Sequence, residues 1–177
     1  MTVRSEALPK HRRRSRPLTA SGEGISAEGR GPVAGRSRTR PTPASPPRPD
    51  QLAGVTIVVV DDDAGSLDYF DIALRSYGAV VLTASNAVDA LRLVRARPPD
   101  VVLSDIAMAD HDGYWLVQEI RRSDDEVLRR IPVIATTAYG REHSRQRTLE
   151  AGFTEHLAKP VDPVLLTVTI AKLTGRS

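Results

Sequence analysis

The stretch that most constrains the fold is an apolar run that ends abruptly in three acids, residues 55–63. Four of its residues in a row, Ile57 to Val60, are β-branched and apolar on both alternating faces, which is typical of a strand covered on both sides in a parallel α/β sheet. Carboxylates that follow such a strand lie at the carboxyl edge of the sheet, where open α/β folds bind ligands. The mutual repulsion of these acids requires a cation, a proton or a lysine nearby.

Composition divides the chain of 177 residues into two parts. Residues 1–50 hold eleven Lys or Arg against four acids, and eight of the thirteen prolines, with few large apolar residues. Such a segment buries too little surface to offset the entropy lost on ordering. We therefore predict a disordered, basic, Pro/Arg-rich extension over residues 1–50 and one folded domain over residues 51–177.

The sharpest feature of the extension is a basic block, Lys10 to Arg16. This block could contact nucleic-acid phosphates, or it is a solvated run in a disordered segment; no aromatic residue interleaves with it to stack on bases. The Arg- and Ser-rich start also resembles an organelle transit peptide, but its many prolines oppose the amphipathic helix that a transit peptide needs. The block is the one segment where we consider nucleic-acid binding.

Other classes of protein are excluded more directly. The chain has no cysteine, which rules out disulfides, thiolate metal sites and cysteine nucleophiles. Its longest apolar runs are too short to span a bilayer, and Met1 to Arg16 lacks the apolar stretch of a signal peptide. We expect a cytoplasmic protein without a membrane partner.

The pattern of residues 51–177 predicts an alternation of strands and helices. Further strands are predicted over 79–83, 101–103, 132–135 and 155–158. Helices are predicted between and after them: one with its apolar face at Leu67, Phe70, Leu74 and Tyr77, one capped by Asn86, one opened by Asp112, one over 141–151 that is loosely anchored by Leu149, and one capped by Asp162 with Val164, Leu165, Val168 and Ala171 facing inward. Five strands and five helices in strict alternation predict an α/β fold, a doubly wound parallel sheet with helices on both faces.

The polar residues of chemical interest all follow strands. Asp61, Asp62, Asp105, Thr137 and Lys159 stand at the ends of the first, third, fourth and fifth predicted strands. A doubly wound sheet brings these ends to one edge. One acid after a strand is ordinarily a helix cap or a turn residue, but the same placement at four strands indicates a site.

These residues resemble the receiver domain of two-component response regulators, which has a CheY-like fold. The matching pieces are the run Val58 to Asp63, the run Ser104 to Met108 with Asp112-Gly113, the pair Thr137-Ala138 and the pair Lys159-Pro160. The resemblance covers residues 55 to about 173. The chain departs from the family pattern in having Ala109 at a usual proline, His111 at a usual methionine and His156 at a usual aromatic switch residue.

The resemblance implies a fold and a set of roles. The fold is flavodoxin-like, with strand order 2-1-3-4-5 and a cis peptide at Lys159-Pro160. Asp105 is the phosphoacceptor, taking a phosphoryl group from a phosphohistidine, and Thr137 and Lys159 contact that group. Asp61, Asp62 and Asp105, with the backbone carbonyl of Ala107, hold Mg²⁺. The resemblance implies no role for Asp63, and we expect this residue to face solvent or to cap the first helix.

The resemblance also implies partners and a switch. The partners are a histidine kinase or histidine phosphotransfer protein and a downstream protein target, contacted through the 141–151 helix, the last strand and the last helix. His156 turns inward as the switch, or it is a half-exposed histidine of the last strand. A phosphorylation-dependent homodimer is left open. No DNA-binding domain is expected to follow, because the chain ends at Ser177.

Two alternatives remain at the level of sequence. Lys159 and Asp105 could form a simple salt bridge at the sheet edge. Asp61 and Asp63 also give the D-x-D pattern of a haloacid-dehalogenase-type phosphatase, with Thr137 and Lys159 as its other residues. That family needs an acidic pair after the lysine, where this chain offers only Asp162, and it leaves Asp105 unexplained. We therefore expect a signalling domain that catalyses only its own phosphorylation and dephosphorylation.

Overall fold

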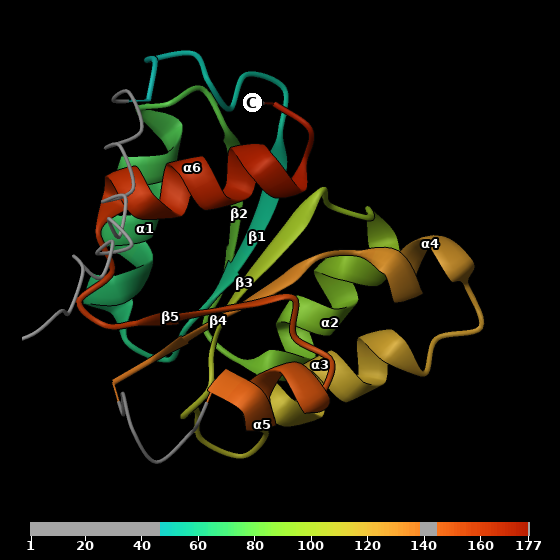
Figure 1. The fold of residues 1–177 in the computed structure, drawn as a ribbon. Coiled ribbons are helices and arrows are strands. Elements are labelled where there is room, and N and C mark those ends of the chain that lie inside the picture. The colour runs from blue at the N-terminus through green and yellow to red at the C-terminus, as the bar shows by residue number, and fades with distance from the viewer. Residues whose placement is uncertain (1–46, 139–144, 177) are drawn as a thin grey trace, which may run out of the picture. The chain divides into compact units, whose positions relative to one another are not determined.

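Five strands form one parallel sheet in the order β2-β1-β3-β4-β5 in the computed structural model (Figure 1). The structure describes residues 47–138 and 145–176. This confirms the predicted sheet and its strand order. The predicted extension lies outside the described residues except for its last four, so its disorder stays a prediction. The strands are β1 (Thr56–Val60), β2 (Val80–Ala84), β3 (Val101–Asp105), β4 (Val133–Thr137) and β5 (Glu155–Ala158).

Helices cover both faces of the sheet because the strands are apolar on both sides. In β1, Ile57 and Val59 pack with residues of α1 and α6, whereas Val58 and Val60 pack with residues of α2 and α3. Figure 1 shows α1 and α6 on one side of the sheet and α2, α3 and α5 on the other. The helices are α1 (Ala64–Arg75), α2 (Ala87–Ala96), α3 (Gly113–Arg121), α4 (Glu126–Arg130), α5 (Arg145–Glu150) and α6 (Pro163–Leu173).

The predicted helix caps are present. The side chains of Asn86, Asp112 and Asp162 each accept a hydrogen bond from a backbone N–H of the first turn of α2, α3 and α6, all at 2.8 Å. These bonds satisfy donors that a helix cannot pair internally. Three of the helices therefore begin where the sequence places them, close to the edge where the strands end.

The prediction of strict alternation is wrong at one point, because two helices, α3 and α4, lie between β3 and β4. The second, α4, has five residues, a cap at Asp125 and one buried apolar side chain, Leu128. So short a helix shows no apolar period in the sequence. The predicted helix over 141–151 corresponds to α5, and its first four residues lie outside the described part of the chain.

The inward face of α6 also differs from the prediction. Leu166, Thr167 and Ile170 are buried with Ala171, whereas Val164 and Leu165 are 42% and 52% exposed. The sequence of α6 is apolar on nearly every side, so its pattern does not indicate which face is buried. Packing against the sheet selects that face. In the described part of the chain, no helix is long and apolar enough to cross a membrane.

Candidate functional site

The sheet brings the predicted site residues to one edge. Asp61 follows β1, Asp105 and Thr137 end β3 and β4, and Lys159 follows β5. The register of the sheet aligns the carboxyl ends of β1, β3, β4 and β5, since Val60 pairs with Ser104, Asp105 with Thr136, and Thr137 with Ala158. Residues far apart in the sequence therefore meet because parallel strands end side by side.

Lys159 bridges two of the acids. Its Nζ lies 2.7 Å from Asp61 Oδ2 and 2.8 Å from Asp105 Oδ1. The side chains of Asp61 and Asp105 are buried, at 2% and 7% exposure, and the lysine side chain is 23% exposed. The peptide bond between Lys159 and Pro160 is cis, as the resemblance implies. The structure therefore brings Asp61, Asp105 and Lys159 into contact at this edge, as expected from the order of the strands.

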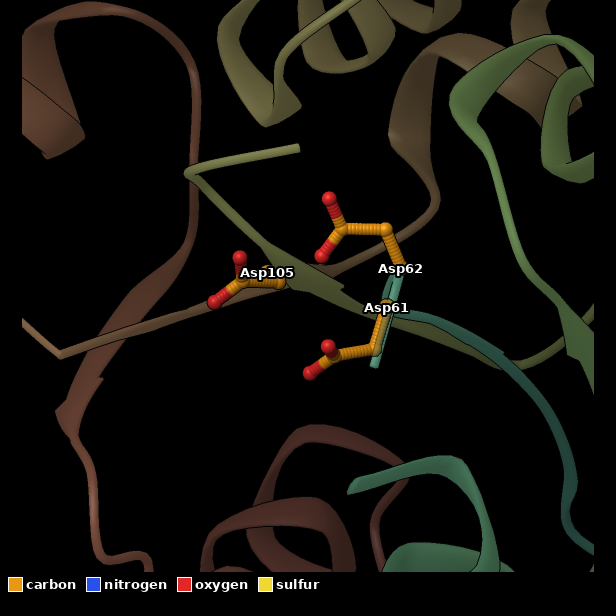
Figure 2. Close-up of side chains that lie close together, drawn as sticks. All are labelled: Asp61, Asp62 and Asp105. Carbon is orange, nitrogen blue, oxygen red and sulfur yellow. The ribbon is translucent and has the colours of Figure 1, made fainter. Parts of the chain in front are cut away.

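Asp62 completes a group of three carboxylates at the ends of β1 and β3 (Figure 2). One oxygen from each of Asp61, Asp62 and Asp105 lies within 4.8 Å of the others, and Asp62 is the exposed member. Asp63 is not part of the group. Its side chain accepts a hydrogen bond of 2.7 Å from the Ser66 amide, which lowers the pKa of Asp63 and caps α1.

The environment shifts the pKa values of Asp105 and Lys159. Burial is the largest influence on Asp105 and raises its pKa, and the charge of Asp61 adds to this; the hydrogen bond and charge of Lys159 oppose the rise without cancelling it. Burial lowers the pKa of Lys159, but its hydrogen bonds and charge interactions with Asp105 and Asp61 outweigh burial and raise it. Lys159 therefore stays protonated at neutral pH, whereas ionisation of Asp105 is unfavourable to the fold.

We expect Asp105→Asn to raise the urea midpoint of unfolding at pH 7 in the absence of Mg²⁺. A carboxyl whose pKa is raised in the folded state contributes its full stability only below its unfolded pKa, and this stability is lost as the pH rises through the folded pKa. The advantage of the variant should therefore shrink as the pH falls below the raised pKa of Asp105. Asp68→Asn, an exposed change on α1, is the control. Equal midpoints for wild type and Asp105→Asn at pH 7 would contradict the expectation.

The structure also describes the three remaining predicted residues, Thr137, Ala107 and His156. Thr137 is fully buried, and its carbonyl accepts a hydrogen bond from the Lys159 amide at 2.8 Å. Ala107 lies in the loop between β3 and α3 and donates its amide to Asp105. His156 is half-buried on β5, with its Nδ1 3.2 Å from Thr148 Oγ1. The fully buried residue of α5 is Thr148, not the predicted anchor Leu149.

Two features of the connection from β3 to the start of α3 are not predicted from the sequence. A Cβ on Gly113 would overlap the Asp105 carbonyl oxygen and lie 3.0 Å from Ile106 Cα, so glycine is required directly behind the site. The amide of Ala109 donates to Asp62 Oδ2 at 3.2 Å. In the sequence, the Asp112-Gly113 pair was the signal for the close contact at Gly113. The presence of Ala109 in place of the usual proline was the signal for the hydrogen bond to Asp62.

Comparisons with known proteins show the family to which the folded part of the chain belongs. The family model "Response regulator receiver domain" matches residues 57–171. An uncharacterized 14.6 kDa protein of Leptolyngbya boryana is 43% identical over 116 residues, which cover 65% of this chain and 86% of that protein. A probable transcriptional regulator ycf27 of Guillardia theta is 36% identical over 121 residues, which cover 68% of this chain and 46% of that protein. This chain therefore spans less than half of the second relative.

A solved structure shares both fold and sequence with the chain. It is the receiver domain of sensor histidine kinase PA1611 from Pseudomonas aeruginosa, described with a magnesium ion in its active-site cleft. It is 32% identical, with a TM-score of 0.64, over 70% of this chain and 99% of that one. Since the family model matches well over half of the sequence and the fold agrees with it, this chain belongs to the response regulator receiver domains of two-component signal transduction.

Proposed function

We propose that the chain accepts a phosphoryl group on Asp105 from a phosphohistidine of a histidine kinase or histidine phosphotransfer protein. The observation that carries this proposal is the Asp105 carboxylate at the end of β3, with Lys159 Nζ 2.8 Å from one of its oxygens. In the reaction a carboxylate oxygen bonds to phosphorus, the P–N bond breaks, and the departing imidazole keeps the electron pair of that bond and takes up a proton. A carboxylate is a weak nucleophile, so positioning and charge neutralisation must supply the rate.

The donor set fits a magnesium ion. Mg²⁺ prefers oxygen ligands and keeps several waters, and the three carboxylates of Asp61, Asp62 and Asp105 carry more negative charge than the Lys159 ammonium neutralises. The Ala107 carbonyl is the further ligand that we propose. When bound, the ion supplies positive charge beside the phosphoryl oxygens. The magnesium described for the Pseudomonas relative supports this assignment.

The other roles follow from the same arrangement. Lys159 contacts one phosphoryl oxygen, and Thr137 donates a hydrogen bond to another. Phosphorylation adds negative charge beside the carboxylates, and a movement of Thr137 toward it leaves space for His156 to turn inward. The contact between His156 and Thr148 supports this switch, since it connects β5 to α5, where we place part of the output surface.

The output surface comprises α5, β5 and α6 and contacts a downstream protein. Val164 and Leu165 on α6 support a protein partner, because both are apolar and about half exposed. Phosphorylation-dependent pairing of two copies is a second use of this surface. We assign no membrane partner, restrict nucleic-acid contact to the basic block at 10–16, and place the protein in the cytoplasm, where ATP supplies histidine kinases.

The same proposal makes the chain a signalling domain, not an enzyme that acts on a separate substrate. The comparisons give the haloacid-dehalogenase-type phosphatase no support, since the family model and the relatives reported above are regulators or receivers, or are uncharacterized. In the structure the first and second acids, Asp61 and Asp62, face Asp105, whereas Asp63 caps α1. The two acids of the D-x-D pattern, Asp61 and Asp63, therefore do not lie together in the cluster.

Labelling with phosphoramidate tests the proposed function, because its P–N bond resembles that of phosphohistidine. We expect the full chain to incorporate radioactive phosphate in the presence of Mg²⁺, in an acid-stable, alkali-labile bond, and Asp105→Asn to abolish incorporation. The control is Asp63→Asn, because asparagine caps helices as well as aspartate does. It should label like the wild type.

The outcome also distinguishes the receiver from the phosphatase. Label that persists in Asp105→Asn and disappears in Asp61→Asn would make Asp61 the nucleophile and favour the phosphatase. No label in the wild type with several small phosphodonors would refute the phosphoacceptor role.

A further inference from the structure

The exposed carboxylate of the cluster is oriented by a backbone amide. Asp61 and Asp105 are buried and held by Lys159, but Asp62 is exposed. The hydrogen bond that the described residues make to Asp62 comes from Ala109, whose N–H lies 3.2 Å from Oδ2. Proline, which the family usually carries at this position, has no N–H to donate. This chain therefore has a contact that the usual residue cannot make.

Local bonds give the loop around Ala109 a definite shape. The His111 amide donates to the Ala109 carbonyl at 2.8 Å, across Asp110, which has a φ of 62°. The His111 ring then stacks on Trp115, with centroids 4.2 Å apart and planes 20° from parallel. A three-residue turn of this kind fixes the direction of the neighbouring peptides. The Ala109 amide is thus directed by the turn that follows it and by the start of α3.

We infer that Ala109 is a positioning residue for magnesium binding, because its amide restricts Asp62 to an orientation in which the carboxylate faces the cluster. An exposed aspartate samples several rotamers, and a ligand that is already oriented loses less entropy when a metal binds. The carboxylate of Asp62 has two oxygens, so that one can accept the amide while the other binds the ion. Ala109 acts through Asp62 and touches neither metal nor phosphate.

This inference rests on the proposed magnesium site, and it is tested by binding, not by phosphorylation. Trp115 is the only tryptophan of the chain and lies at the loop, so its fluorescence reports a titration of the full chain with Mg²⁺. We expect Ala109→Pro to raise the dissociation constant for Mg²⁺ about threefold to tenfold, the usual size of one hydrogen bond. Ala109→Ser keeps the amide on an exposed position and should bind like the wild type.

The outcomes are distinguishable. If the wild type binds Mg²⁺ and Ala109→Pro binds it equally well, the inference fails and the proposed function stands. Tighter binding by Ala109→Pro also overturns the inference, since the amide would then compete with the metal. If the wild type itself fails to bind at millimolar concentrations, the proposed site fails.

A second measurement does not depend on how proline changes the loop. In the metal-free wild type, hydrogen exchange of the Ala109 amide should be slowed by its bond to Asp62, and Asp62→Ala should remove this protection. Equal exchange rates in the two proteins would overturn the inference.

Discussion

Gly113→Ala should lower the free energy of unfolding by about 3 kcal/mol, although alanine normally stabilises a helix relative to glycine by roughly 0.5–1 kcal/mol. Gly113 is the first residue of α3, and its amide donates to the Ile106 carbonyl at 2.9 Å. A methyl group there would overlap the Asp105 carbonyl oxygen and crowd Ser104 Oγ at 3.1 Å. Backbone at the end of a buried strand cannot move aside as a flexible side chain can.

Urea unfolding of the two proteins measures this loss. The matched control is Gly65→Ala, in the first turn of α1, where among the described residues the nearest atom to the new Cβ is Asp63 Oδ1 at 3.3 Å. That oxygen also caps α1, but it belongs to an exposed side chain and can adjust where backbone cannot, so we expect a change smaller than about 1 kcal/mol. If Gly113→Ala behaved like Gly65→Ala, close approach of α3 to Asp105 would not be what requires glycine.

Lys159→Met should lower the free energy of unfolding by about 2 to 3 kcal/mol at pH 7 without Mg²⁺. The change leaves Asp61 and Asp105 buried without the ammonium that contacts both. Removal of one partner from a buried ion pair costs about 3–5 kcal/mol, and the partial exposure of Lys159 reduces this. Lys172→Met, an exposed change in the last turn of α6, should cost less than about 0.5 kcal/mol.

The pH dependence gives the prediction a second signature. The pKa of Lys159 is raised in the fold, so its contribution is fully present below the unfolded lysine pKa and is lost as the pH rises through the raised value. The difference in stability between wild type and Lys159→Met should therefore persist at neutral pH and disappear in strongly alkaline solution. A difference no larger than that of Lys172→Met at pH 7 would show that the ion pairs do not stabilise the fold.

The sequence predicts a structural feature best where one physical constraint acts on each residue separately. The β-branched run ending at Val60 predicts a strand buried on both faces, and both of its faces are buried. Asn86, Asp112 and Asp162 cap helices as predicted, because capping is a local contact of a side chain with the next turn. Acids and a lysine after successive parallel strands indicate a common edge, because the topology leaves one place for such ends to meet.

The remaining features depend on contacts between segments distant in the sequence. The face that α6 buries, the short helix α4 and the hydrogen bond from Ala109 to Asp62 follow from packing that the local pattern does not determine. Arg121 is a further example, since its guanidinium donates to the carbonyls of Gly152, Arg129 and Ile131 and so connects α3 to the end of α4 and to the turn after α5.

The sequence by itself therefore determined the fold class, the strand order through the family resemblance, and the residues that gather at the carboxyl edge. The tertiary structure decided which of those residues touch. Asp61 and Asp105 share Lys159, Asp62 stays exposed beside Ala109, and Asp63 turns away to cap α1. The physical reason is that spacing along the chain fixes where a backbone segment can go, whereas burial, hydrogen bonding and charge at the assembled edge select the position of each side chain.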